Sequence, residues 1–486
     1  MADADLHLRS AAGRGTLAAA TVASGMGFLE TTVVNVALPH IGADLGASLG
    51  GLQSAISGYA LTLASFVLLG GAIGDRYGRR RVFLIGLVWF TAASVLCGLA
   101  PGVGWLVVAR ALQGIGAALL IPGSLAILQS SFRPEERGRV IGAWSGLSGA
   151  FTAVGPFVGG WLIDTLSWRW IFFLNVPFAA VVLVAARRWA PESQDPARGQ
   201  HRFDLAGACL GTAGLGGISY TLIEAPEVGL GAWPVLTGAV VGVAGIAALV
   251  LVERSRGMAA MLPPRLFSMP RFSALNVYTV VVYAALGGQL FFLSIQLQNV
   301  LHYSALATGM ASLPVTALLL VGSSRAGALS ARIGPRLPLV AGPLVAAAGL
   351  MLVRSVSAGD HYWPRLFPGI GIFGVGLTLV VAPLTAAVLA AVPDQFAGLA
   401  SGVSNAAARA GGLLAVAALP LIVGLSGSAY QAPARLTPGF RSAVLCCAGL
   451  LVLGTALAAL LLRPATTSRP PGRAGQRPAG YGRSAS

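Results

Sequence analysis

Apolar segments follow one another along almost the whole chain, and short charged segments separate them. Each apolar segment is about 20 residues long or longer, which lets an α-helix cross the hydrocarbon core of a bilayer. The fourteen segments are 16–38, 51–73, 82–100, 104–130, 138–163, 169–187, 204–223, 233–252, 272–297, 305–330, 337–355, 364–391, 398–424 and 440–462. The pattern predicts an all-α polytopic membrane protein with fourteen transmembrane helices.

The composition favours the same class of protein. Of the 486 residues, 56% are hydrophobic and 10% are charged, whereas a soluble domain carries about 25% charged residues. The four cysteines lie in apolar segments, and the five histidines lie in loops, tails or segment ends, without the spacing of metal ligands. No motif of a hydrolase, a metalloprotease or a nucleotide-binding loop occurs. The sequence therefore predicts no metal site, no cofactor and no enzymatic activity.

Arginine supplies all 32 basic residues, and the formal net charge is +16. With the N-terminus placed in the cytoplasm, 24 arginines fall on the cytoplasmic side, 5 fall on the other side, and 3 lie within apolar segments. Because cytoplasmic loops of membrane proteins carry an excess of basic residues, both termini are predicted to be cytoplasmic. This distribution along membrane loops also argues against nucleic-acid binding as the reason for the charge.

The loop between the second and third segments combines glycines with charges. Its main residues are Gly71, Asp75, Arg76, Gly78, Arg79 and Arg80. Two interpretations remain open: a basic stop signal for topology, or a conformational latch in which Asp75 and Arg79 pair across helices in one state. Residues 327–336, between the tenth and eleventh segments, repeat Gly, Arg, Gly and Arg at the same offsets, which predicts a two-fold repeated bundle.

The Gly-x-x-x-Asp-x-x-Gly-Arg-Arg form of residues 71–80 resembles the signature loop of the major facilitator superfamily. Residues 29–39 resemble the first-helix motif of its fourteen-helix drug:proton antiporters, and residues 110–116 resemble its buried-arginine motif. Residues 168–177 and 203–207 are similar to the starts of the sixth and seventh helices. The antiporter motif is matched by Gly155, Pro156, Gly159 and Gly160. The resemblance covers roughly residues 16–462.

This resemblance implies a domain organisation and a function. The expected parts are a cytoplasmic N-terminus (1–15), a six-helix bundle (16–190), an extra helix pair (200–255), a second six-helix bundle (270–462) and a disordered cytoplasmic tail (463–486). The implied activity is proton-coupled efflux of small amphiphilic molecules such as drugs or antibiotics. A multi-pass monomer in a bacterial inner membrane is expected, with the substrate and protons as partners and the proton gradient as energy source.

Four positions depart from the family pattern. Glu30 stands where an aspartate is usual, and Gln53 stands where an aromatic residue is common. Phe151 lies one turn before Gly155, where a small residue is usual. Arg409 follows Asn405 by four residues instead of three, which leaves its role open.

Two charged residues inside apolar segments are the candidates for proton coupling. Glu30 lies about 14 residues into the first segment, roughly 20 Å from its start at 1.5 Å per residue. Burial disfavours an ionised carboxylate, so this group is expected to load and release a proton. Arg110 cannot deprotonate and needs a partner inside the bundle, for which Glu30 is one candidate. A permanently protonated Glu30 and a purely structural Arg110 are the alternatives.

Other residues are candidates for substrate binding. The expected cavity residues are Asn35, Gln113, Trp144, Tyr283 and Gln289. An apolar cavity with one acidic group fits a neutral or cationic amphiphile. Three other functions stay open: a proton-coupled or facilitated nutrient importer, a receptor without transport, and a membrane enzyme.

Overall fold

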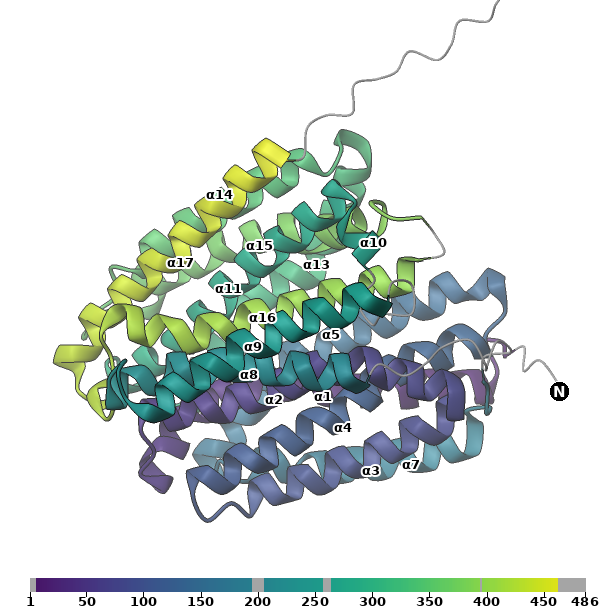
Figure 1. Ribbon diagram of the computed structural model, residues 1–486, viewed down its shortest axis with the longest axis horizontal. Helices are drawn as coiled ribbons and strands as arrows, with labels where there is room; N and C mark the ends of the chain where they lie inside the picture. The colour runs from purple at the N-terminus through teal and green to yellow at the C-terminus, as the bar shows by residue number, and fades with distance from the viewer. Residues whose placement is uncertain (1–5, 195–204, 257–263, 394–395, 462–486) are drawn as a thin grey trace, which may run out of the picture.

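The structure is a computed structural model that describes residues 6–194, 205–256, 264–393 and 396–461. These residues form long helices joined by short loops, and most of the helices run side by side (Figure 1). The predicted all-helical membrane fold is confirmed. The predicted tail, 463–486, lies outside the described residues.

The helices fall into two sets with a pair between them. The first set is α1 (Ala11–Leu45), α2 (Leu49–Tyr77), α3 (Arg79–Gly98), α4 (Val103–Ser131), α5 (Pro134–Thr165), α6 (Trp170–Phe173) and α7 (Asn175–Trp189). The pair is α8 (Leu205–Val228) and α9 (Trp233–Arg256), followed by the short α10 (Pro264–Phe267). The second set is α11 (Pro270–Asn299), α12 (Ala305–Ala311), α13 (Leu313–Ile333), α14 (Arg336–Val353), η2 (Tyr362–Leu366), α15 (Phe367–Leu389), α16 (Ala397–Val423), η4 (Ala429–Gln431) and α17 (Pro433–Leu461).

Thirteen spans in the described part of the chain are long and apolar enough to cross a membrane, and the number reaches fourteen when the bent helix α2 is one span. The axis of α2 turns by 49° between Leu49–Val67 and Leu69–Tyr77. The sixth and tenth predicted segments are each interrupted, at Leu174 and at Ser312. The number of helices therefore agrees with the hydropathy pattern, while the breaks inside spans were not visible in it.

Most helices are longer than the apolar segments that predicted them, and α1 is an example. Helix α1 starts at Ala11 because the Ser10 side chain accepts a hydrogen bond from the backbone N–H of Gly13, which caps the first turn. It ends at Leu45 because Gly46 adopts a left-handed conformation with φ 59°. A serine cap and a left-handed glycine thus set the two ends of α1, and hydropathy alone did not locate them.

The repeated loops have the same backbone conformation. Gly78 ends α2 with φ 111°, and Gly334 ends α13 with φ 83°. Glycine is favoured at both positions because side-chain residues rarely adopt a positive φ. Each glycine is followed within two residues by an arginine that starts the next helix, Arg79 in α3 and Arg336 in α14. The sequence repeat therefore corresponds to a structural repeat.

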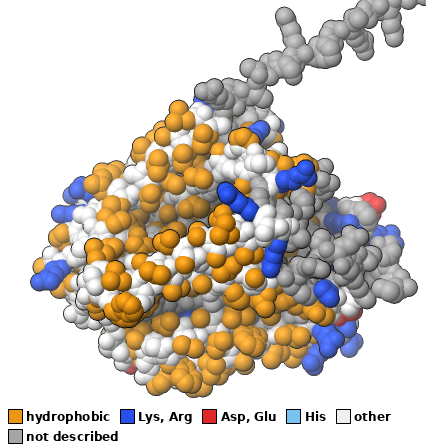
Figure 2. All heavy atoms as spheres, in the orientation of Figure 1, with side chains coloured by type: hydrophobic (Ala, Val, Ile, Leu, Met, Phe, Trp, Pro, Cys, Tyr) orange, Lys and Arg blue, Asp and Glu red, His pale blue; other side chains and the backbone are white. Residues whose placement is uncertain are grey.

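Helices α8 and α9 pack against each other, and α8 also contacts α2 of the first set and α16 of the second. In Figure 1 this teal pair lies across the front of the molecule, along the line where the two sets meet. Hydrophobic side chains spread over this face, and arginines gather mainly toward the helix ends (Figure 2). This face of the molecule therefore has the apolar surface that contact with a bilayer requires.

The two helix sets are joined near one membrane face. The face that carries Arg76, Arg79–Arg81 and Arg332–Arg336 is called the arginine-rich face here, and the other is called the opposite face. All hydrogen bonds between described residues of the two sets lie in the half near the opposite face. They include Tyr430 Oη to the Ala47 carbonyl (3.0 Å) and Gln298 Nε2 to the Val36 carbonyl (2.8 Å). The opposite face is thus closed in this conformation.

Helices α5 and α12 form the closest part of this closure. The Asp164 carboxylate accepts hydrogen bonds from the backbone N–H groups of Ala305 (3.0 Å) and Leu306 (2.9 Å). A Cβ atom on Gly160 would lie 2.5 Å from the Leu306 Cα, and a Cβ on Gly309 would lie 2.2 Å from the Pro156 carbonyl oxygen. Only glycine allows the two backbones to approach this closely.

We expect Gly160→Leu to separate α5 from α12 and to open the opposite face, because the new side chain overlaps the α12 backbone. Spin labels at the exposed Leu166 and Met310, in a chain without its native cysteines, would report a longer distance. Gly142→Leu is the control, since a Cβ at Gly142 in the same helix meets nothing within 4 Å. An unchanged distance in Gly160→Leu would contradict this packing argument.

Candidate functional site

A buried ion pair lies in the middle of the first helix set. Arg110 Nη1 in α4 donates to Glu30 Oε1 in α1 over 2.6 Å. The side chains are 2% and 1% exposed, respectively. The pair that the sequence left open is therefore formed in this conformation.

Polar groups on neighbouring helices surround the pair. Asn175 Nδ2 in α7 donates to Glu30 Oε2 over 3.0 Å and to Ser94 Oγ in α3 over 2.8 Å. Gln113 Oε1 accepts from Arg110 Nη1 over 2.7 Å, and Gln113 Nε2 donates to Ser94 Oγ over 3.2 Å. Four helices thus contribute to one hydrogen-bonded network, in which both carboxylate oxygens of Glu30 have partners.

Aromatic rings and a backbone carbonyl complete the surroundings of the arginine. The guanidinium carbon of Arg110 lies 4.4 Å from the centroid of the Tyr59 ring and 5.9 Å from that of Phe172. Such contacts are favourable for a cation removed from water. Arg110 Nε also donates to the Ala55 carbonyl of α2 over 3.3 Å. The arginine is held in place by groups other than Glu30, so it stays positioned when the carboxylate changes its charge.

The strength of the attraction between Glu30 and Arg110 depends on the charge of the Glu30 carboxyl group. When Glu30 is ionised, it neutralises Arg110 inside a region from which water is largely excluded, where the attraction is strong. When Glu30 is protonated, the charge of Arg110 loses its counter-ion. Binding of a proton to Glu30 would therefore remove the charge attraction within this buried pair.

Sequence reasoning missed part of this network. Asn175 belongs to the motif of residues 168–177, which does not indicate its partner, and one serine in an apolar segment, such as Ser94, carries no signal. Gln113 was expected in the substrate cavity, and it lies instead beside Arg110, one helical turn away on α4. The i, i+3 spacing of Arg110 and Gln113 was the signal that could have placed them together.

The loop of residues 71–80 holds a second ion pair. Arg79 Nε at the start of α3 lies 2.8 Å from Asp75 Oδ1 near the end of α2. The Asp75 side chain is 43% exposed, so water screens this pair far more than the buried one. Arg76 is exposed, and a Cβ on Gly71 would be 3.7 Å from Pro122, which is an ordinary contact.

A segment after α7 covers the same loop. The Glu192 carboxylate accepts from the backbone N–H groups of Arg80 (3.0 Å) and Arg81 (3.1 Å), the first turn of α3. A carboxylate is favoured there by the helix dipole and by the free N–H groups. A Cβ on Gly78 would lie 2.9 Å from this carboxylate. Glycine at 78 therefore serves both the turn and the approach of Glu192, which the sequence did not indicate.

The antiporter motif lies at the contact of α5 with α1. A Cβ on Gly155 would lie 2.6 Å from Thr32 Oγ1, and one on Gly159 would lie 2.4 Å from Val33 Cγ1. The bulky Phe151, one turn earlier, packs over Gly25 of α1, where a Cβ would lie 2.5 Å from its ring. The departure at Phe151 is thus accommodated by a glycine on the facing helix.

A mostly apolar cavity of about 180 Å³ lies between the two helix sets. Residues of α1, α5 and α11 to α15 line it, and Asn35 and Gln289 are among them. The Gln289 side-chain oxygen has no hydrogen-bond partner among the described residues. Trp144 and Gln113 do not line this cavity. The Trp144 indole instead donates a hydrogen bond to Ser24 Oγ over 3.1 Å, within the first set of helices.

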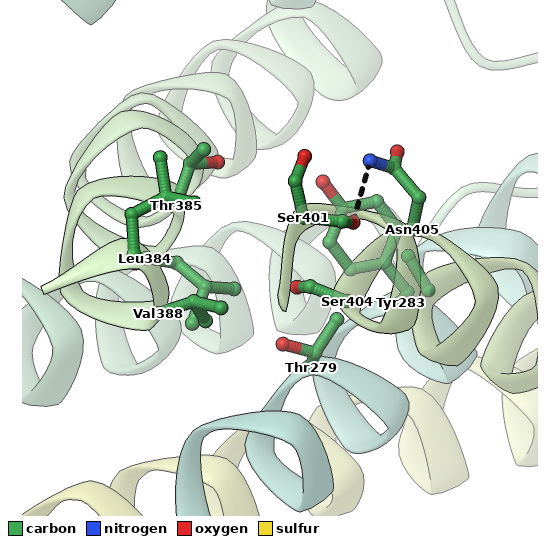
Figure 3. Close-up of a pocket in the computed structure, with 10 residues that line it drawn as sticks. Thr279, Tyr283, Leu384, Thr385, Val388, Ser401, Ser404 and Asn405 are labelled. Atoms are coloured by element: carbon green, nitrogen blue, oxygen red, sulfur yellow. Dashed lines mark hydrogen bonds between the residues drawn. The ribbon is translucent and has the colours of Figure 1, made fainter. Parts of the chain in front are cut away.

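A smaller pocket of about 50 Å³ lies in the second set, toward the arginine-rich face. Figure 3 shows α15, α16 and α11 around it, with several hydroxyl groups and the Asn405 amide. Its polar lining residues are Thr279, Tyr283, Thr385, Ser401, Ser404 and Asn405. Tyr283 therefore lies in this pocket and not in the larger cavity.

Two repeated helical bundles, a cavity between them and one buried ion pair define a secondary transporter of the alternating-access class. A family model described as Major Facilitator Superfamily matches residues 20–416 and 277–483. The chain belongs to this superfamily.

Its relatives include named resistance proteins. The chain is 34% identical over 418 residues to the multidrug resistance protein Stp of Mycobacterium tuberculosis, covering 85% of this chain and 77% of the relative. It is 36% identical over 447 residues to the puromycin resistance protein pur8 of Streptomyces alboniger, covering 89% and 88%. A crystal structure of the peptide transporter POT in complex with sulfate has a TM-score of 0.67 at 16% identity, covering 94% and 97%. This last similarity concerns the fold alone.

We expect Arg110→Gln to lower the free energy of unfolding by about 3–5 kcal/mol, because it leaves Glu30 buried without its counter-charge. The loss should be larger at about pH 8 than at about pH 5, since Glu30 takes up a proton at low pH and then needs no counter-charge. Denaturant unfolding in detergent measures it.

The control for this prediction is Arg325→Gln, because Arg325 is exposed and contacts only its own helix at Val321. The double variant Glu30→Gln with Arg110→Gln should recover part of the stability. Equal losses for Arg110→Gln at both pH values would contradict the buried pair.

Proposed function

We propose that the protein exports small organic molecules, such as drugs or antibiotics, in exchange for protons. The observation that carries the proposal is the Glu30–Arg110 pair, a single ionisable carboxylate held within hydrogen-bonding distance of an arginine inside the membrane. The names of the relatives Stp and pur8, which concern resistance, support a drug-like substrate.

The arginine-rich face is the cytoplasmic face in this proposal, since basic residues accumulate in cytoplasmic loops. The membrane is then the inner membrane of a bacterium. With this orientation, the closed opposite face is the outer face, and substrate reaches the central cavity from the cytoplasm. The mostly apolar lining of the 180 Å³ cavity suits the apolar part of an amphiphile.

Proton entry drives the return of the carrier. After the outer face has opened and substrate has left, Glu30 takes a proton from outside, and the pair with Arg110 loses its electrostatic attraction. Closure of the outer face then carries the proton inward, where its release restores the ion pair. One charge moving across about 100 mV supplies roughly 2.3 kcal/mol, to which the pH gradient adds.

Helix α1 links the proton site to the closure. Glu30 is followed within one turn by Thr32 and Val33, which pack on the glycines of α5. Helix α5 in turn contacts α12 of the second bundle. A small rotation of α1 on protonation therefore reaches the contact that closes the outer face.

We expect Glu30→Gln to abolish proton-driven efflux, because a glutamine binds no proton but keeps the size of the side chain. Export in inside-out vesicles should fall at least 10-fold, while Glu30→Asp keeps most of it. Glu135→Gln, which removes an exposed carboxylate, is the control. Full proton-driven export by Glu30→Gln would rule out the proposed coupling site.

A further inference from the structure

Arg409 is a second arginine at mid-depth, and the exchange mechanism does not use it. It lies 12 residues after the start of α16 at Ala397, about 18 Å along a helix of 27 residues. The residue is partly buried, and it makes no hydrogen bond or ion pair with any residue that the structure describes. An arginine inside a membrane protein ordinarily faces a partner of opposite charge or a water-filled pathway.

Its surroundings place it between the two bundles. Helix α16 contacts both α11 of its own bundle and α2 of the first bundle. Two phenol groups lie near Arg409, those of Tyr283 in α11 and Tyr59 in α2. Tyr59 is the ring that packs on Arg110. Arg409 therefore faces the interface across which the buried network lies.

The helices described for the second bundle contain no carboxylate side chain. From Arg254 to the end of the chain the sequence contains only two acidic residues, Asp360 and Asp394. Asp360 precedes η2, and Asp394 is not among the described residues. Glu30 is the buried acid of the first bundle at this depth and is paired with Arg110. Two central arginines thus share one central carboxylate, which leaves one positive charge without a counter-ion.

The pocket of Figure 3 lies on the same turns of α16. Asn405 and Ala408 line it, and they precede Arg409 by four residues and one residue. Its hydroxyl and amide groups are hydrogen-bond donors and acceptors, and none of its lining residues is acidic. A polar pocket without negative charge beside an unpaired arginine is suited to an oxygen anion.

We propose that Arg409 and the hydroxyl-lined pocket bind an anionic oxygen group of the exported molecule, so that the substrates are amphiphiles with a carboxylate or an acidic phenol or enol. This inference rests on the proposed export function. The sequence analysis predicts a neutral or cationic substrate instead, because it rests on Glu30 as the acidic group of the cavity. The apolar part of the molecule extends into the 180 Å³ cavity.

The charge of such a substrate changes the energetics of exchange. Export of one monovalent anion with import of one proton moves two positive charge equivalents inward. The membrane potential acts on both charges, so its contribution to the driving force is then about twice that for a neutral substrate. Arg409 also supplies the counter-charge that makes the anion stable inside the protein.

The test compares 4-(1-pyrenyl)butyrate with its methyl ester, which differ in the charge of one oxygen group. Fluorescence titration of purified protein at about pH 8 should give a Kd for the acid at least 10-fold lower than for the ester. Arg409→Gln should abolish this preference without changing the Kd of the ester, while Arg409→Lys retains part of it. Arg325→Gln, which removes an exposed arginine from another helix of the same bundle, should keep the preference.

Two results would overturn the inference: a wild-type protein that binds the acid no more tightly than the ester, or a preference that survives in Arg409→Gln. An equal loss of acid and ester in Arg409→Gln would also contradict it, since the arginine would then have a structural role. Failure of this inference can be distinguished from failure of the proposed export function. The binding test depends on Arg409, whereas proton-driven efflux of a neutral compound is a separate measurement that depends on Glu30.

Discussion

The ion pair between Glu30 and Arg110 is the interaction on which the rest of the structure depends. Removing two charges from water is costly, and the cost is offset only when each charge meets a partner and further hydrogen bonds. Asn175 and Gln113 provide those hydrogen bonds, and Tyr59 covers the guanidinium. Because these side chains come from separate helices, the packing of the first bundle is arranged around one buried carboxylate.

The two bundles meet through small residues, and this connects the ion pair to the contacts that close the opposite face. Gly155 and Gly159 let α5 lie against α1, while Gly160 and Gly309 let α5 and α12 touch at the backbone. Close-packed contacts of this kind transmit small displacements, because a protein interior has little free space. A change in the charge of Glu30 therefore has a direct packing route to the second bundle, through one intervening helix.

Much of the fold could be predicted from the sequence, because a bilayer imposes a minimum length and an apolar surface on each helix. Pairs of residues that are close in the sequence could also be predicted, and the pair of Asp75 and Arg79 is an example. Contacts between helices that are distant in the sequence could not be predicted. Asn175 and Ser94, for example, carry no signal in the sequence, and only the fold brings them into the network around Glu30. The packing of the Phe151 ring on Gly25 could not be predicted either, because nothing in the sequence indicates that these two residues are in contact.

The most direct test of proton binding at Glu30 is the infrared difference spectrum of the protein in lipid between about pH 8 and about pH 5. A glutamine side chain does not titrate in this pH range, so Glu30→Gln is the control. We predict the absorption band of a newly protonated, buried carboxylic acid in the wild-type protein and its absence in Glu30→Gln. The same band in both proteins, or no such band in the wild type, would contradict a mechanism in which this residue carries the proton.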